Sequence, residues 1–171
     1  MPSLILRSAW LQPGTSGITG RGVLLDYAEY AERKGIELKH FESTPIPLKA
    51  LQEIATEIGV TFRSGDILFV RSGYCRAYEG MTAEEEPKIS QRDSLDFIGV
   101  EAGEATLRWL WKNQFCAIAG DAPGFERAPI MGPHADLDYV LHHWCLANWG
   151  SMYNPNILLE GFSCLEVISV R

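Results

Sequence analysis

Residues 115–126, FCAIAGDAPGFE, constrain the fold more than any other stretch of this chain. The small and apolar residues at 116–119 are typical of a short buried strand, which ends at Gly120. Asp121 follows at once, and α/β sheets collect their chemistry in the loops beyond the carboxyl ends of their strands. Asp121 is therefore a candidate catalytic or ligand-holding carboxylate. The alternative is a local role, in which Asp121 accepts backbone N–H groups of the following turn ahead of Pro123.

Apolar runs and helical periodicity elsewhere predict an alternating chain of strands and helices. Strands are expected at 22–25 and 66–70, and helices at 27–34, 48–58, 101–113 and 135–149. The charged composition of 74–97 predicts a short helix within a long surface excursion. Residues 1–19 are interpreted as an irregular lead-in, and 162–170 as a closing strand. This order predicts one α/β domain over residues 1–171, with a mixed or mostly parallel sheet and flanking helices.

Charge and cysteine content argue against several classes of function. The net charge is -7, and no basic run is longer than the pair Arg33-Lys34, so nucleic acid is not an expected partner. No apolar run approaches the roughly 20 residues that span a bilayer, and the first ten residues do not resemble a signal peptide. We therefore expect a soluble, cytoplasmic protein with no membrane partner. The four cysteines show no CxxC spacing, which favours reduced thiols over a zinc knuckle or a disulfide framework.

Four segments together resemble one protein family. They are GRGVLLDYAEYAERKG at 20–35, SGDILFVRSG at 64–73, LWKNQFCAIAGDAPGFE at 110–126 and LHHWCLANWG at 141–150. In this order and spacing they resemble the cyclase family that includes kynurenine formamidases, in the longer form common in fungi. The resemblance covers most of residues 18–150. It implies a swivelling β/α/β fold and hydrolysis of an N-formyl or lactam amide, in tryptophan catabolism or secondary metabolism.

The resemblance also implies a metal site, of which this sequence carries a part. Zinc or manganese in such a site polarises the substrate carbonyl and lowers the pKa of an attacking water. The family's upstream motif of histidine and aspartate has no counterpart here, because residues 1–19 contain neither a histidine nor an acid. We therefore expect the N-terminal part of the family fold to be missing. The residues themselves point to no cofactor, and the resemblance alone implies zinc or manganese.

The resemblance assigns roles to individual residues near the end of the chain. His143 takes the position of the family's downstream histidine, which makes it a candidate catalytic residue and metal ligand. The family's glutamate falls at Pro155 in an ungapped comparison, and proline has no side-chain donor. A five-residue insertion would instead bring Glu160 into that role as a second metal ligand. Asp121 matches the aspartate that follows the family's strand.

Three further residues are candidates for substrate binding. Arg71 and Ser72 match a pair at the end of a strand that has a supporting role in the family. Trp149 belongs to a set of tryptophans at helical spacing, and such a set lines either an aromatic substrate pocket or, more often, the core. The other members of the set are Trp109, Trp111 and Trp144.

Two hypotheses for the function follow, from different classes. In the first, the chain is a cyclase-family enzyme that acts on a small aromatic or polyketide-type molecule, with the substrate held near Asp121 and His143. Without a metal, His143 would serve as the general base and Asp121 as its partner. In the second, the chain is a truncated, metal-free relative that serves as a binding subunit. Its partner is then a second copy of itself or a full-length homologue that supplies the missing ligands.

Overall fold

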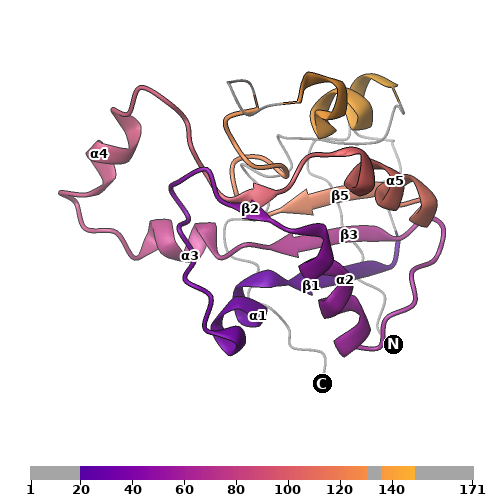
Figure 1. Cartoon of the computed structure of the whole chain (residues 1–171). Coiled ribbons are helices and arrows are strands. Elements are labelled where there is room, and N and C mark those ends of the chain that lie inside the picture. The colour runs from indigo at the N-terminus through magenta and orange to yellow at the C-terminus, as the bar shows by residue number, and fades with distance from the viewer. Residues whose placement is uncertain (1–19, 131–135, 149–171) are drawn as a thin grey trace, which may run out of the picture.

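A parallel three-stranded sheet forms the centre of the molecule in the computed structural model, which describes residues 20–130 and 136–148 (Figure 1). The strands are β1 (Gly22–Asp26), β3 (Ile67–Arg71) and β5 (Ala117–Gly120), in the order β1-β3-β5. All three run in the same direction, with Leu25 opposite Val70 and Val70 opposite Gly120. Their carboxyl ends therefore lie together at one edge of the sheet. The predicted α/β fold with a parallel sheet is confirmed.

Two helices form where the sequence predicts them. Helix α1 (Tyr27–Lys34) begins at Asp26, whose side chain accepts a hydrogen bond from the backbone N–H of Glu29, and it ends at Gly35 in the left-handed conformation. Helix α2 (Leu48–Glu57) follows Pro47. The two helices lie beside each other against β1 and β3 (Figure 1). Both bury one apolar face against the sheet, as the periodicity predicts.

The central strand β3 is buried on both faces, as is usual for parallel strands. Leu68 and Val70 belong to the main core, which also contains Leu25 of β1 and Leu51 and Ile54 of α2. On the opposite face, Ile67, Phe69 and Ala119 form a second buried cluster. Leucine and isoleucine side chains in such positions each stabilise the fold by about 1.5–3 kcal/mol through the area they remove from water. The continuous apolar run of β3 thus matches its central position.

A buried ion pair marks the start of β3, where the sequence predicts that the strand already includes Asp66. Asp66 precedes the strand, and its carboxylate accepts hydrogen bonds from the Arg21 guanidinium at 2.8 and 2.5 Å and from the Arg63 backbone N–H at 2.8 Å. Burial opposes ionisation of Asp66, but the bonds from Arg21 and Arg63 outweigh it and hold its pKa below the ordinary value. Arg21 thereby links the start of β1 to the start of β3.

The region between β3 and β5 contains more structure than the sequence predicts. Helix α3 (Tyr74–Glu79) is the expected short helix, and a second one, α4 (Glu86–Ser90), extends away from the sheet (Figure 1). The short strand β4 (Gly99–Val100) of this region, which the sequence does not predict, pairs in parallel with another unpredicted strand, β2 (Pro45–Ile46), which lies earlier in the chain between α1 and α2. Helix α5 (Glu104–Asn113) begins three residues later than expected. Two-residue strands carry too little periodicity to be recognised in a sequence.

The single helix expected at 135–149 is wrong over the part that the structure describes. Leu137–Tyr139 forms a 3₁₀ turn, Val140 is extended, and a new helix begins at Leu141 and continues as a π-helix over His143–Asn148. The new start has a physical cause, because the side chain of Glu126 accepts the backbone N–H groups of Leu141 and His142. No helix among the described residues is long and apolar enough to cross a membrane. The expected lead-in at 1–19 and closing strand at 162–170 lie outside the described residues.

Candidate functional site

Asp121 joins the carboxyl ends of two strands. Its Oδ1 accepts hydrogen bonds from the backbone N–H of Ser72 at 2.6 Å and from the Ser72 hydroxyl at 2.7 Å, and its Oδ2 accepts the backbone N–H of Gly73 at 2.8 Å. These bonds run across the sheet to the residues that open α3, rather than to the turn at Pro123. Asp121 therefore supplies the negative charge that the start of α3 favours. Two of the sequence candidates, Asp121 and Ser72, are in direct contact.

A histidine that the sequence did not single out, His40, lies beside this pair. Its Nε2 lies 3.1 Å from the position that a Cβ on Gly73 would occupy. Burial lowers the pKa of His40, while the charge of Asp121 and a hydrogen bond with the backbone of Ser72 act in the opposite direction. Gly73 has a φ of 84°, in the left-handed region that favours glycine, so the backbone can approach the imidazole closely. His40 lies in a loop without periodicity, and no sequence pattern signals this contact.

Arg71, the other strand-end candidate, is engaged with Asp26. The Arg71 guanidinium pairs with the Asp26 carboxylate at 2.5 Å, which links the carboxyl ends of β3 and β1. The Arg71 Nε atom is buried and has no hydrogen-bond partner among residues 20–130 and 136–148. Arg71 and Asp121 thus bind the three strands together at the edge where the sequence predicts a site.

Little space lies between these groups. The hollow beside Ser72 and Asp121 has a volume of about 10 Å³, and its walls include Ile46 and Phe125. A single water molecule needs about this much room. A substrate would therefore contact this edge from outside or after a rearrangement of the surrounding loops.

A second group of polar residues lies further along the chain, at Glu126 and His142. The carboxylate of Glu126 is 1% exposed and accepts the backbone N–H of Leu141 at 3.0 Å and of His142 at 2.7 Å. It also contacts Nδ1 of the His142 ring, whose side chain is 22% exposed. A buried carboxylate on Nδ1 fixes the orientation of an imidazole, so that any proton is exchanged through Nε2. This is the arrangement of an oriented general base.

A close approach of two backbone segments places Glu126. The segment around Glu126 runs beside β4, with hydrogen bonds between Val100 N–H and Phe125 O at 2.9 Å and between Arg127 N–H and Val100 O at 3.0 Å. At Gly99 a Cβ would lie 2.5 Å from backbone atoms of Glu126 and of Arg127. Glycine is therefore required at position 99 for this crossing.

The structure separates the two neighbouring histidines. His143, the candidate carried over from the family, is exposed, whereas His142 contacts the buried Glu126. The carboxylate that contacts His142 is 16 residues away along the chain. Trp149 and Glu160 lie outside the described residues. The roles of all these residues stay predictions.

The described residues do not fit a metal ion. Within 20–130 and 136–148 there is no group of three or more histidine, cysteine, aspartate or glutamate side chains arranged to hold one. A catalytic zinc needs about three protein ligands, and Glu160 is not among the described residues.

Comparisons with known proteins agree with this fold. A family model described as "Putative cyclase" matches residues 13–127, which include Asp121 and Glu126. A solved structure described as the crystal structure of a novel cyclase is similar, with a TM-score of 0.53 and 24% sequence identity. The similarity covers 70% of this chain and 37% of that one, so the chain spans well under half of that structure. No curated protein sequence matches the chain.

Proposed function

Because this chain belongs to the cyclase family, we propose that it acts on the amide bond of a small aromatic or polyketide-type molecule, with His142 as the group that transfers protons. The observation that supports this proposal is the contact between the buried Glu126 carboxylate and Nδ1 of His142. The substrate class, an aromatic formamide or a lactam, follows from the resemblance in the sequence. Because the chain spans 37% of the solved cyclase, the activity of a whole family member is part of the proposal.

The proposed chemistry needs one base and one water. Nε2 of His142 removes a proton from water as its oxygen attacks the amide carbonyl carbon. The resulting tetrahedral oxyanion collapses, the C–N bond breaks, and His142 returns the proton to the departing nitrogen. An amide and a water thus give a carboxylic acid and an amine, or a ring-opened amino acid from a lactam. Glu126 holds the imidazole in one orientation, as the carboxylate of a catalytic triad does.

The residues at the carboxyl end of the sheet have a supporting role in this proposal. Asp121 and Ser72 hold β3 and β5 together, and Arg71 does the same for β1 and β3. Such rigid support keeps a site within the small tolerances that catalysis requires. We propose that substrate contacts at this edge involve Arg71, whose side chain is 30% exposed, whereas Ser72 is buried and supports it from within.

The test is a turnover assay on a panel of aromatic formamides and lactams, in the presence of a metal chelator. His142→Ala should lower kcat by about 10²–10⁴-fold, the usual contribution of a general base. Added imidazole should restore part of this rate, because it replaces the missing side chain in solution. Imidazole should not rescue Glu126→Gln, which keeps its histidine but loses the charge that orients it.

Two outcomes would overturn the assignment. The first is a His142→Ala protein that folds normally and retains the wild-type rate. The second is a loss confined to His143→Gln, which would restore the histidine predicted from the sequence. Urea unfolding of each variant separates loss of chemistry from loss of fold, because Glu126 also begins the helix at Leu141.

A second candidate function is that of a non-catalytic binding or partner subunit, which is the second of the two hypotheses from the sequence. One observation favours it: both oxygens of Asp121, a candidate catalytic residue in the sequence, accept hydrogen bonds from Ser72 and Gly73. In that case the polar groups at this edge serve the fold alone. Stable co-purification with a full-length homologue, without turnover by this chain, would support the second candidate.

A further inference from the structure

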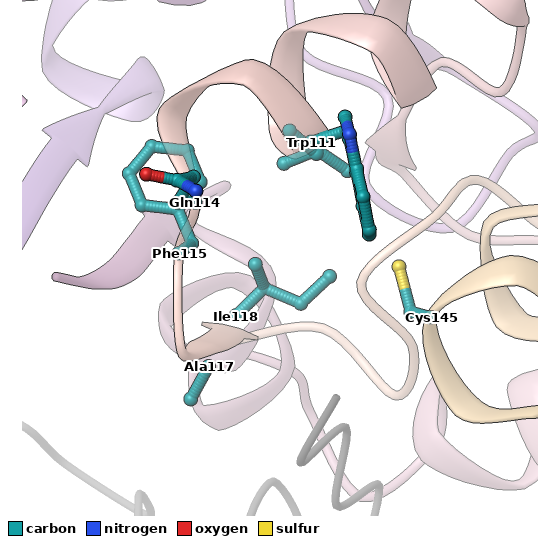
Figure 2. A pocket seen from close by; sticks show the side chains of 7 residues that line it. Trp111, Gln114, Phe115, Ala117, Ile118 and Cys145 are labelled. Atoms are coloured by element: carbon teal, nitrogen blue, oxygen red, sulfur yellow. The ribbon is translucent and has the colours of Figure 1, made fainter. Parts of the chain in front are cut away.

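A half-open apolar pocket lies near the start of β5, and neither Glu126 nor His142 is among its described lining residues. Its volume is about 200 Å³, and Figure 2 shows the side chains that surround it. They come from the end of α5, from β5 and its approach, and from the helix that follows Val140. The lining residues are Leu110, Trp111, Gln114, Phe115, Ala117, Ile118 and Cys145.

Six of the seven lining residues within the described part of the chain have apolar side chains, and none of the seven carries a formal charge. Trp111 is 60% exposed, which is unusual for so large an apolar side chain, and its indole extends from α5 along the pocket (Figure 2). Phe115 and Ile118 lie on the α5 and β5 sides of the same space. Two aromatic residues at one apolar hollow provide faces and edges against which a ring can pack.

The thiol of Cys145 closes the side opposite α5, with its sulfur toward the pocket (Figure 2). Burial, together with the charge of Glu126, raises the pKa of this thiol to about 12. At neutral pH the sulfur is therefore an uncharged, polarisable group, which makes favourable contacts with aromatic rings.

Gln114 supplies the polar group in this wall. It follows α5 with a φ of 53°, and its backbone is fixed by hydrogen bonds from its N–H to Trp111 O at 3.1 Å and from Gly65 N–H to its own O at 2.9 Å. The side-chain amide can both donate and accept one hydrogen bond to a ligand. A few polar groups among apolar walls are typical of sites for small molecules.

We propose that this pocket binds an uncharged planar aromatic molecule with one amide or carbonyl group, which Gln114 recognises. The size agrees, because a closed apolar cavity of about 150 Å³ already accommodates a benzene ring. The described lining residues carry no charge, so they offer no counter-charge to an anion or a cation that leaves water. The site is independent of the His142 chemistry, and either proposal can fail without the other.

The test uses two fluorinated probes that differ in one group, 4-fluorobenzamide and fluorobenzene, observed by ¹⁹F NMR with the full chain. The wild-type protein should broaden the benzamide signal saturably, with a dissociation constant on the order of 1 mM, as expected for about ten non-hydrogen atoms. Fluorobenzene should bind about fivefold more weakly, because it lacks the partner for Gln114.

Three variants assign the binding to this pocket. Trp111→Ala, an exposed position that leaves the core intact, should weaken both probes by about tenfold through loss of the aromatic wall. Gln114→Gly suits the left-handed backbone and should weaken the benzamide alone, to the level of fluorobenzene. Leu95→Ala, 63% exposed and outside the pocket lining, is the matched control and should bind both probes like the wild type.

Either of two results would show that the probes do not bind in this pocket, and a third would refute the recognition by Gln114. One is the absence of saturable broadening with the wild-type chain at millimolar probe. The other is binding that Trp111→Ala and Gln114→Gly leave unchanged, which would place the probe elsewhere. Equal loss of the two probes in Gln114→Gly would refute the role given to the amide group.

Discussion

Replacement of Asp121 tests how much of the fold depends on one carboxylate. Asp121→Ala removes the acceptor of three hydrogen bonds, from the Ser72 N–H, the Ser72 hydroxyl and the Gly73 N–H. A hydrogen bond to a charged group contributes about 1.5–3 kcal/mol to stability. The site is part-buried, so water replaces some of this loss. We therefore expect the free energy of unfolding to fall by about 3 kcal/mol.

Asp121→Asn should destabilise the protein less, by about 2 kcal/mol, because its amide oxygen can still accept both bonds from Ser72. Its NH₂ group then faces the N–H of Gly73, where two donors meet. Ser72→Ala combined with Asp121→Ala should cost less than the sum of the single changes, since the two side chains share a 2.7 Å hydrogen bond.

Urea unfolding followed by circular dichroism measures these differences, with the slope of the transition compared among variants. The control is Asp93→Ala, which removes an exposed acid and should change stability by less than about 0.5 kcal/mol. If Asp121→Ala were as stable as Asp93→Ala, the three hydrogen bonds would not stabilise the fold. A catalytic role for Asp121 would then be favoured over a structural one.

Two further predictions concern acid stability and assembly. Arg21→Ala should destabilise the protein by about 3 kcal/mol at pH 7, because it leaves a buried carboxylate without its cation. The pKa of Asp66 in the folded protein lies below the ordinary value of 3.8. The difference in stability between wild type and Arg21→Ala should therefore be complete above pH 3.8 and disappear as the pH falls through the folded pKa of Asp66. An equal difference at all pH values in urea unfolding would contradict this prediction. We also expect self-association, because β1 and β5 are the outer strands of the three-stranded sheet in the described part of the chain. Outer strands with unpaired backbone groups promote pairing with another chain. Sedimentation of a monomer at the highest attainable concentration would argue against it.

The strands and helices that could be predicted from the sequence are those with local signals. The apolar run at β3 and the Pro47 and Gly35 boundaries of the helices depend on neighbouring residues alone, and they occur as expected. The order of the elements likewise predicts a parallel sheet, since helices connect the three strands.

The candidate site is less predictable, because its contacts join residues far apart in the chain. Glu126 accepts the backbone N–H of Leu141, where the helix begins after the extended Val140. It also contacts the ring of His142, 16 residues away along the chain, and not that of His143. The helical period through this region shows no sign of that carboxylate, so it predicts one continuous helix. His40 is similar, since its position beside Gly73 depends on how a loop returns to the sheet. Distant polar pairs leave no periodic trace in a sequence.

The close approach of two backbone segments at Gly99 should make this position intolerant of mutation, although glycine has no functional side chain. A methyl group there would meet backbone atoms of Glu126 and Arg127 at 2.5 Å, a distance that side-chain rotation cannot relieve. In a saturation library, position 99 should therefore reject even alanine, although glycine has no reactive group to lose. The defect would be transmitted through Glu126 to the imidazole of His142. Position 99 would then behave genetically like a site residue, and a search restricted to chemically active side chains would overlook it.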